Sequence, residues 1–308
     1  MIKEKSPRNK TIELSEDEAS LFSERLLIPT TSLRKEDIIN KTIQGDLFDV
    51  INYLPKQFAD LIIIDPPYNL TKDFANLRFR KKTDDGYLQY LESWFPQVIS
   101  LLKPNGSVYI CGDWGSTASL YTIMDKYLNV LSRITWQREK GKGGNLNWKN
   151  AMEDIWFGVN NQKDYYFDLD SVKIRRKVIA PYKENGKPKD WEDTPDGKYR
   201  MTRPSNFWDD ITIPFWSMPE NTQHPTQKPE KLIAKLILAS CPKDGVVFDP
   251  FLGSGTSSVV AKKLGRKYCG VELDPTYACI AEKRLSLAEN NKDIQGYSNG
   301  TFWERNSL

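Results

Sequence analysis

A repeated alternation of apolar strand and helix constrains the fold of this chain more than any other feature of its sequence. Its clearest instance is the apolar run at residues 60–64 (DLIII), which suits a parallel strand buried on both faces. The alternation runs over residues 41–137 and returns over 227–289. Because strands joined by helices pack as one parallel sheet between two layers of helices, we expect an α/β, doubly wound, mostly parallel sheet.

The expected elements follow from hydrophobic periodicity and from the turn residues between periodic segments. The expected strands are residues 41–44, 60–64, 107–111, 128–136, 154–159, 245–249 and 267–272. The expected helices are 15–27, capped by Ser15 with Glu18 three residues on, then 47–54, 85–102, 116–127, 227–240, 257–264 and 275–289. Residues 103–106 (KPNG) are expected to form a turn.

A basic, aromatic segment with irregular, Gly- and Pro-rich stretches separates the two halves of this pattern. The chain carries 44 Lys and Arg against 41 Asp and Glu, a net charge of +3. Residues 138–203 hold 15 of the basic and 11 of the acidic residues, whereas the rest of the chain holds 29 and 30. The whole positive surplus therefore lies in this segment, which is where we would look for contacts to a polyanion.

Length and composition exclude several classes of protein. A chain of 308 residues can bury an enzyme-sized core, and no apolar stretch approaches the roughly 20 residues that span a bilayer. We therefore expect a cytoplasmic protein with no membrane partner. The four cysteines are far apart and are expected to be reduced, and His224 is the one histidine. A Cys/His metal site has almost no ligands to draw on, so no metal is expected.

A glycine turn follows the expected strand at 245–249. Gly253 and Gly255 permit a ligand to approach the backbone, and Glu272 ends the next strand, where a carboxylate can accept from ribose hydroxyls. A dinucleotide fingerprint needs glycine or alanine at Ser258, and a phosphate-binding loop needs Lys followed by Ser or Thr. Neither is present, which favours an adenosine cofactor without a pyrophosphate. The alternative is a tight turn that binds no ligand.

The segment Asp65-Pro66-Pro67-Tyr68 comes directly after the apolar run, at the strand end where ligands bind in this architecture. Both prolines lack an N–H, so the segment offers carbonyl and carboxylate acceptors and almost no donors. Asp65 and the Pro66 carbonyl can accept both hydrogens of an exocyclic amine and direct its lone pair toward an electrophile. Tyr68 would supply a flat face for a base. The alternative is a proline turn with a buried tyrosine.

At these residues the chain resembles the S-adenosylmethionine-dependent amino-methyltransferases of DNA. DPPY at 65–68 is similar to their catalytic motif, and Phe251, Gly253 and Gly255 match their Phe-x-Gly-x-Gly cofactor motif. The catalytic motif comes first, and HPTQKP at 224–229 precedes the second motif, as in the permuted β group. The resemblance spans about residues 41–288. It implies a circularly permuted, Rossmann-like methyltransferase sheet with an inserted target-recognition segment, and S-adenosyl-L-methionine as cofactor.

The resemblance also implies which residues bind the cofactor. Those expected around its methionine part are Asp249, Phe251, Gly253 and Gly255. Glu272 is expected on the ribose. Asp46 is expected at the adenine, with a helix N-cap as the alternative. Thr226 and Lys228 resemble a pair near the cofactor carboxylate, and the alternative for Lys228 is a solvated lysine at a helix start.

Double-stranded DNA is the partner that the resemblance implies. Residues 138–205 would form the target-recognition segment, with candidate DNA contacts at Lys140, Lys142, Lys149, Arg175 and Arg176, each of which could instead be a solvated charge. Trp136 resembles an aromatic residue of the target-base pocket, with a core tryptophan as the alternative. The remaining divisions are an N-terminal extension of unknown role (1–40), a catalytic half (41–137), a cofactor half (206–290) and a polar tail (291–308).

The function that the resemblance implies is site-specific methylation of the N6 amine of adenine, with the base flipped out of the duplex. Cytosine N4 is the nearest alternative, because it is also an exocyclic amine, although family members acting on it more often carry Ser in place of Asp65. More distant alternatives are an RNA or protein amine methyltransferase and a DNA-binding module without catalysis. A homodimer and a cognate restriction endonuclease are further expectations that the sequence itself does not address.

Overall fold

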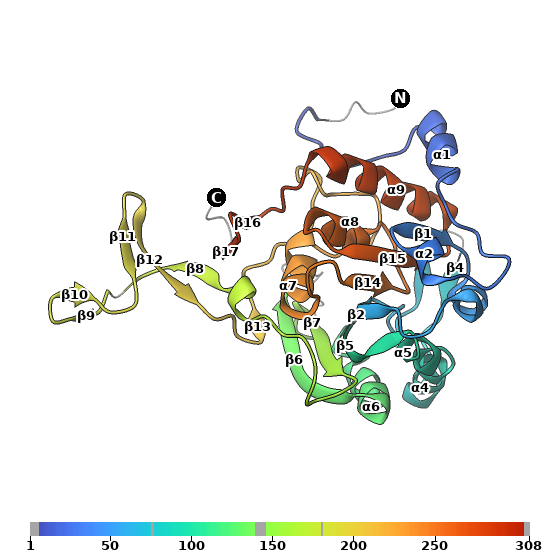
Figure 1. Cartoon of the computed structure of the whole chain (residues 1–308), viewed down its shortest axis with the longest axis horizontal. Coiled ribbons are helices and arrows are strands. Elements are labelled where there is room, and N and C mark those ends of the chain that lie inside the picture. The colour runs from blue at the N-terminus through green and yellow to red at the C-terminus, as the bar shows by residue number, and fades with distance from the viewer. Residues whose placement is uncertain (1–5, 75–76, 139–145, 180, 305–308) are drawn as a thin grey trace.

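The body of the protein is an eight-stranded sheet (Figure 1). The computed structural model describes residues 6–74, 77–138, 146–179 and 181–304. In spatial order the strands are β1 (Lys41–Gln44), β15 (Lys267–Glu272), β14 (Val246–Asp249), β2 (Ala59–Ile64), β5 (Leu102–Gly112), β7 (Met152–Val159), β6 (Asn129–Gln137) and β13 (Phe207–Trp208). Five neighbouring pairs are parallel, and β7 is antiparallel to both of its neighbours. The expected doubly wound, mostly parallel sheet is confirmed.

Helices cover both faces of this sheet. They are α1 (Glu16–Ser23), α2 (Lys35–Ile38), α3 (Leu47–Val50), α4 (Asp84–Glu92), α5 (Phe95–Ile99), α6 (Thr117–Tyr127), α7 (Glu230–Ser240), α8 (Thr256–Lys263) and α9 (Pro275–Asn290), with short 3-10 turns at Ile51–Tyr53 and Asp170–Val172. Figure 1 shows α8 and α9 on one side of the sheet and α4, α5 and α6 on the other. None of the helices in the described part of the chain is long and apolar enough to cross a membrane.

Strand β2 is buried on both faces, as its unbroken apolar run predicts. Leu61 and Ile63 belong to the core beneath α7, α8 and α9. Ile62 and Ile64 belong to the core beneath α3 to α6. Because successive side chains of a strand point to opposite faces, this one strand supplies both cores, and its end is held rigidly from two sides.

The order of the strands brings the two sequence motifs together. Val247 of β14 pairs with Leu61 of β2, and Gln44 of β1 pairs with Glu272 of β15. All four of these strands are parallel, so they end at one edge of the sheet. The DPPY segment and the glycine turn are therefore neighbours in space, although the hydrogen bond from Val246 N to Asp60 Oδ2 joins residues 186 apart in the sequence.

Two expectations for residues 85–106 were wrong. The helix expected at 85–102 is broken into α4 and α5, because Trp94 leaves the helical conformation (φ −131°) and Pro96 begins a new first turn. Residues 103–106 were expected to be a turn, but β5 already begins at Leu102 and runs through them, with an irregularity in its pairing to β2.

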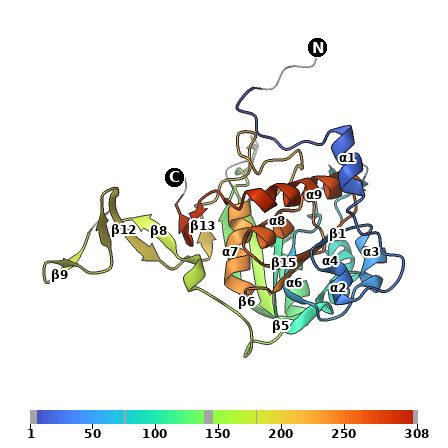
Figure 2. The ribbon, with the colours of Figure 1, turned by 45° about the horizontal axis from the view of Figure 1, so that its top comes forward.

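A second sheet of five strands projects from the body as an arm (Figures 1 and 2). In spatial order it consists of β11 (Glu192–Thr194), β12 (Gly197–Thr202), β8 (Ile174–Lys177), β17 (Thr301–Trp303) and β16 (Tyr297–Ser298). Two small hairpins complete the described strands, β3 (Lys72–Phe74) with β4 (Leu77–Phe79), and β9 (Lys183–Glu184) with β10 (Lys187–Pro188). The segment expected as a loose polar tail thus supplies two strands of this sheet, and β17 pairs with β8.

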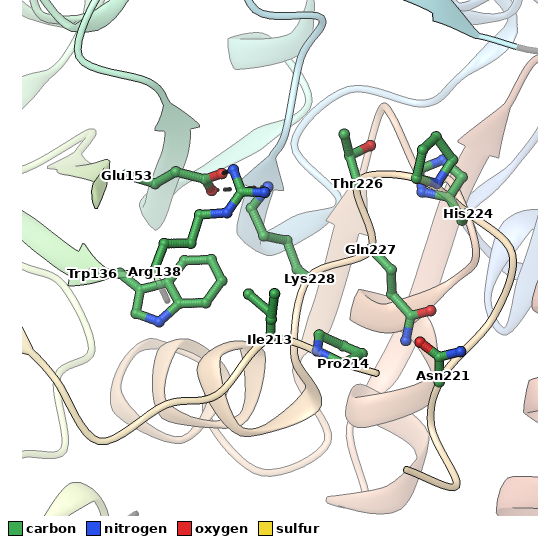
Figure 3. Close-up of a pocket in the computed structure, with 11 residues that line it drawn as sticks. Trp136, Arg138, Glu153, Ile213, Pro214, Asn221, His224, Thr226, Gln227 and Lys228 are labelled. Carbon is green, nitrogen blue, oxygen red and sulfur yellow. Dashed lines mark hydrogen bonds and ion pairs between the residues drawn. The ribbon is translucent and has the colours of Figure 1, made fainter. Parts of the chain in front are cut away.

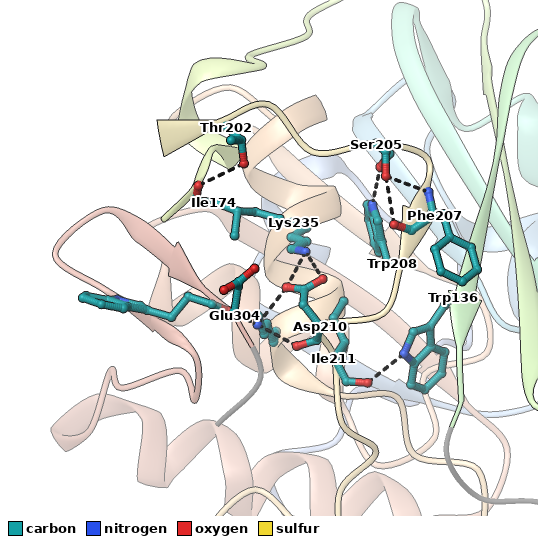
Figure 4. A network of polar contacts seen from close by, with 12 residues as sticks. Trp136, Ile174, Thr202, Ser205, Phe207, Trp208, Asp210, Ile211, Lys235 and Glu304 are labelled. Carbon is teal, nitrogen blue, oxygen red and sulfur yellow. Dashed lines mark hydrogen bonds and ion pairs between the residues drawn. The ribbon is translucent and has the colours of Figure 1, made fainter. Parts of the chain in front are cut away.

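A buried ion cluster fixes the arm to α7 (Figure 4). Lys235 Nζ lies 2.8 and 2.9 Å from the two carboxylate oxygens of Asp210, and Lys231 Nζ lies 2.8 Å from Asp210 Oδ2. The Lys235 ammonium also lies 4.9 Å from the ring centre of Trp208 and 5.6 Å from that of Phe302 in β17. One helix thereby holds the segment after β13 and the C-terminal strand together.

The N-terminal extension packs against the body. Helix α1 begins at the Ser15–Glu18 capping box, as expected, but ends at Ser23 rather than at residue 27. Lys283 of α9 donates to Glu18, and the N–H of Ile12 donates to the carbonyl of Asn221. The extension therefore lies along the segment that leads into HPTQKP at 224–229.

Candidate active site

The catalytic motif follows β2 and is held from several directions. Tyr87 donates its hydroxyl to the Pro67 carbonyl (3.0 Å), and the N–H of Asn69 donates to Ser116 Oγ at the start of α6 (3.1 Å). Among the described residues, none donates to the carbonyl of Pro66. The segment thus keeps Asp65 and the Pro66 carbonyl as acceptors at the edge of the sheet.

A cavity of about 690 Å³ runs along this edge. Its volume lies within the range of small-molecule sites. It brings together most of the residues that the sequence indicated, namely Asp46, Asp65, Pro66, Pro67, Tyr68, Thr226, Lys228, Asp249, Phe251, Gly253 and Glu272. The ends of β1, β2, β14 and β15 therefore form one site.

The two glycines of the turn have different surroundings. Gly253 has φ +55°, and a Cβ there would lie 3.0 Å from Nε2 of His224, across the cavity wall. Gly255 has φ +84°, and a Cβ there would lie 2.5 Å from Cβ of Ala281 in α9. Gly253 thus leaves room at the cavity, whereas Gly255 permits α8 to pack closely on α9 behind it.

Two carboxylates line the cofactor side of the cavity, of which Asp249 is buried and Glu272 is half-buried. Asp249 accepts from Phe251 N (3.0 Å) and Ser257 Oγ (2.6 Å), and burial raises its pKa to about 7. Glu272 Oε2 accepts from Gly253 N (2.7 Å), and burial raises the pKa of Glu272 to about 7 as well. These acids fix the glycine turn and place negative charge or acceptor oxygens beside it.

The structure confirms that Asp46 is a helix N-cap, and its role at the adenine stays a prediction. It is the N-cap of α3, accepting from Phe48 N at 2.9 Å, and it also lines the cavity. Its other carboxylate oxygen can still face a ligand.

The cavity fits S-adenosylmethionine in its donor and acceptor groups. Asp46 and Glu272 supply acceptors for the amine and hydroxyl donors of an adenosine, and the aromatic rings of Phe48 and Phe251 supply apolar wall. The missing side chain at Gly253 leaves the space that a Cβ would fill. The carboxylates on this side of the cavity suit a ligand that carries a positive sulfonium.

Lys228 is buried rather than solvated, which rules out the alternative of an exposed lysine. Its side chain is 8% exposed, and its Nζ lies 2.6 Å from Asp65 Oδ2 and 3.0 Å from the Tyr68 hydroxyl. Burial disfavours the ammonium, but the carboxylates of Asp65 and Glu153 outweigh it and hold the pKa of Lys228 above its ordinary value. Lys228 therefore contacts the catalytic motif directly.

Glu153 is a site residue that the sequence did not reveal. It lies in β7 opposite Trp136, its side chain is 4% exposed, and it forms an ion pair with Arg138. Its Oε2 accepts from the Tyr68 hydroxyl at 3.2 Å and lies 3.3 Å from Lys228 Nζ. The one available signal was a pair of adjacent acidic residues, Glu153 and Asp154, at the start of a mostly apolar strand (MEDIWFGV).

Trp136 belongs to the core and also lines a second, smaller cavity of about 110 Å³ (Figure 3). Its side chain is 1% exposed, and its Nε1 donates to the Ile211 carbonyl at 3.0 Å (Figure 4). Arg138, Glu153 and Lys228 line the same small cavity. Trp136 thus adjoins the charged groups around the catalytic motif.

Three of the candidate DNA contacts, Lys149, Arg175 and Arg176, are described by the structure, and none of the three lines the cavity. Arg175 is in the arm, with its guanidinium 4.1 Å from the ring centre of Tyr199 and 4.6 Å from that of Trp303. Arg176, beside it in β8, is 3.7 Å from Glu304. Lys149 is exposed in the connection between β6 and β7, and Lys140 and Lys142 lie outside the described residues. The four cysteines are free and buried, as expected.

Comparison with known proteins gives consistent matches. A family model described as DNA methylase, for N6 and N4 methyltransferases, matches residues 59–283. The DNA adenine methyltransferase YhdJ of Escherichia coli is 31% identical over 255 residues, covering 80% of this chain and 83% of that protein. The type II methyltransferase M.HpaI of Haemophilus parainfluenzae is 30% identical over 259 residues, covering 82% and 76%.

Solved structures show the same fold. M1.HpyAVI in complex with S-adenosylmethionine superposes with a TM-score of 0.54 at 23% identity, covering 79% of this chain and 98% of that one. The cytosine-N4-specific PvuII DNA methyltransferase superposes with a TM-score of 0.57 at 19% identity, covering 87% and 95%.

Proposed function

This chain belongs to the DNA methylase family, and from that membership we propose that it methylates the N6 amine of adenine at a specific site in double-stranded DNA. The observation that carries the proposal is the position of Asp65. Its carboxylate lies at the end of β2, on the wall of the cavity that the glycine turn also lines. An acceptor for an amine and a site for an adenosine cofactor are therefore adjacent.

The DPPY segment offers acceptors and almost no donors, which explains why the proposed substrate group is an amine. Asp65 and the Pro66 carbonyl each accept one hydrogen of the amine, and this leaves the nitrogen lone pair directed away from them. The carbonyl of Pro67 is already occupied by the Tyr87 hydroxyl. Tyr68 offers its ring to the flipped base, and base–aromatic stacking contributes about 1–3 kcal/mol. Positioning and electrostatics would supply most of the rate enhancement.

The cofactor side of the cavity holds the methyl donor. S-adenosylmethionine, when bound, supplies an electrophilic methyl group. Glu272 would accept from the ribose hydroxyls, Asp46 from the adenine, and Gly253 would let the ligand approach the backbone. Thr226 also lines the cavity and would lie near the cofactor carboxylate.

Adenine is favoured over cytosine by Asp65 itself and by the relative named as an adenine methyltransferase. Likeness to the PvuII enzyme concerns the fold alone. Digestion of methylated DNA to nucleosides, followed by mass spectrometry, separates the two. N6-methyl-2′-deoxyadenosine supports the proposal, and N4-methyl-2′-deoxycytidine would show that cytosine is the target base instead.

DNA would be bound by the arm together with the connection between β6 and β7. Arg175 and Arg176 lie in β8, and the rings around Arg175 fix the direction of its guanidinium. We also propose a cognate restriction endonuclease, because M.HpaI and M.BglII, to which the chain is similar, are named type II methyltransferases. A homodimer is proposed from the family resemblance alone. Sequencing DNA from expressing cells with a modification-sensitive method would give base and recognition sequence together.

Replacement of the central acceptor tests the mechanism. Asp65→Ala should abolish methyl transfer to DNA, because the amine loses the carboxylate that positions it, while binding of S-adenosylhomocysteine by calorimetry survives. Asp85→Ala, which removes an exposed carboxylate of α4, is the matched control and should retain the wild-type rate. Near-normal turnover of Asp65→Ala would contradict the assignment.

A further inference from the structure

Both oxygens of the catalytic carboxylate are occupied by the chain's own donors. The Tyr68 hydroxyl donates to Asp65 Oδ1 at 2.8 Å, and the Lys228 ammonium lies 2.6 Å from Asp65 Oδ2. The proposed function requires Asp65 to accept from the target amine. Each oxygen can accept more than one hydrogen bond, but both donors compete with the amine for the same carboxylate. Asp65 is therefore a stronger acceptor for the amine if these donors have another partner.

A second carboxylate stands within reach of both donors. Glu153 Oε2 is 3.2 Å from the Tyr68 hydroxyl and 3.3 Å from Lys228 Nζ, so each donor already faces two acceptors. Glu153 belongs to β7, where it pairs with Trp136 of β6, and it is held by its ion pair with Arg138. It is a fixed acceptor that lies beside Asp65.

Burial decides where the displaced ammonium can go. Lys228 and Glu153 are nearly inaccessible to solvent, and Asp65 is mostly buried. An ammonium leaving Asp65 without another partner would be a buried, uncompensated charge, and such charges are strongly destabilising. A short movement from Asp65 to Glu153 keeps the ammonium paired throughout, and the cluster of Asp65, Glu153, Arg138 and Lys228 stays electrically balanced.

We propose that Glu153 is a positioning residue for the methyl transfer: it takes over the Lys228 ammonium and the Tyr68 hydroxyl from Asp65 when the target amine arrives. Asp65 then opens to the amine without leaving a charge unpaired. Lys228, in the free protein, holds the place on Asp65 that the amine takes. This inference rests on the proposed function of Asp65.

The alternative is a static cluster, in which Glu153 only neutralises Arg138 and Lys228 only stiffens the loop. The two accounts differ in how substitutions combine. If Glu153 relieves competition on Asp65, then removing the competitor Lys228 should repair the loss of Glu153. If the cluster is static, two substitutions should harm the enzyme at least as much as one.

The experiment compares Glu153→Gln, Lys228→Met and the double variant in single-turnover methylation at saturating DNA and cofactor. Glu153→Gln should slow the reaction about tenfold or more, since roughly 1.4 kcal/mol of added competition corresponds to a factor of ten. The double variant should be faster than Glu153→Gln. Asp154→Asn is the matched control, because Asp154 is the next, equally buried acid of β7 and is bonded instead by Thr117 and Thr135. It should stay close to the wild-type rate.

A second measurement does not depend on turnover. Fluorescence of 2-aminopurine placed beside the target adenine, with S-adenosylhomocysteine bound, reports how much of the base is flipped. Glu153→Gln should lower this signal and the double variant should restore it. Binding of S-adenosylhomocysteine alone by Glu153→Gln should stay within about twofold of wild type, because Glu153 does not line the cofactor cavity.

Each outcome decides between the accounts. A wild-type rate in Glu153→Gln, or a double variant slower than Glu153→Gln, overturns the role of Glu153. If Glu153→Gln does not fold, Glu153→Asp replaces it: that variant keeps the charge and should be slowed less than twofold if the acceptor role holds, and a loss of tenfold or more would overturn it. Absence of methyl transfer by the wild-type protein would instead contradict the proposed function itself.

Discussion

Single residues decide whether the glycine turn can form. Gly255 adopts φ +84° and touches Ala281, whereas Gly265 adopts φ +71° and a Cβ there would have no neighbour within 4 Å. Gly255→Ala should lower the free energy of unfolding by about 2–5 kcal/mol, from left-handed strain of about 1–2 kcal/mol and overpacking of about 1–3 kcal/mol. Gly265→Ala should show the strain alone. Urea unfolding measures both, and equal losses would exclude the close packing of α9 as the cause.

The raised pKa of Asp249 predicts a pH-dependent stability. Its folded pKa of about 7 exceeds the ordinary value of 3.8, so the contribution of its protonated form is complete below pH 4 and is lost as the pH rises through 7. Asp249→Asn cannot ionise. Its free energy of unfolding, relative to wild type, should therefore increase from pH 4 to pH 7.

A second aspartate serves as the control for this measurement. Hydrogen bonds from Ser171 lower the pKa of Asp168 below its ordinary value of 3.8. The ionised Asp168 therefore makes its full contribution to the stability of the folded protein at every pH above that value. The difference between Asp168→Asn and wild type should stay flat over the same range. A flat difference for Asp249→Asn as well would show that Asp249 is ionised at pH 4 in the folded protein.

At the scale of elements, α7 connects the body to the arm through its buried lysines. Lys235 is 1% exposed and shares Asp210 with Lys231. Lys235→Met should lower the free energy of unfolding by about 3 kcal/mol, because it removes one partner of a buried ion pair. Lys126→Met, which breaks the exposed pair between Lys126 of α6 and Glu92 of α4, should cause little measurable loss. A small effect of Lys235→Met in thermal unfolding would show that Lys231 alone neutralises Asp210.

The sequence predicted most helices and strands and most of the residues that line the cavity, because both are marked by local sequence patterns. Apolar runs located β2 and β14, and the capping box located the start of α1. The break between α4 and α5 was missed because the helical periodicity continues across it, although Pro96 marks the place. Glu153 was missed for another reason. Its importance depends on contacts with Tyr68, which follows β2, and Lys228, which precedes α7, and only the tertiary fold brings these residues together.

At the scale of the whole molecule, pairing between distant segments was also beyond sequence patterns. The C-terminal strand β17 joins β8 of the insert, about 130 residues earlier in the chain. Phe302 in β17 is fully buried against Tyr297 and the Lys235 ammonium. A polar tail with one short apolar run gives no indication of such a partner.

Phe302→Ala tests whether this strand supports the arm. It should lower the free energy of unfolding by about 3–5 kcal/mol, as expected for a buried phenylalanine. It should also weaken DNA binding, measured by fluorescence anisotropy at fixed salt, because β17 holds the strand that carries Arg175. Leu287→Ala, at a half-exposed position of α9, is the control. Unchanged stability and DNA affinity in Phe302→Ala would show that the C-terminal strand does not support the arm.

The pairing of β2 with β14 has a consequence for how the protein folds during its synthesis on the ribosome. The contact from Val246 to Asp60 spans 186 residues, which at the usual rates of synthesis means that β2 waits roughly 10–40 s for its partner strand. Until then one flank of this very apolar strand has no permanent neighbour, a condition that invites chaperones or aggregation. The active site is therefore complete only after Glu272 has emerged from the ribosome. We expect a chain interrupted before that point to be degraded and to have no residual activity on DNA.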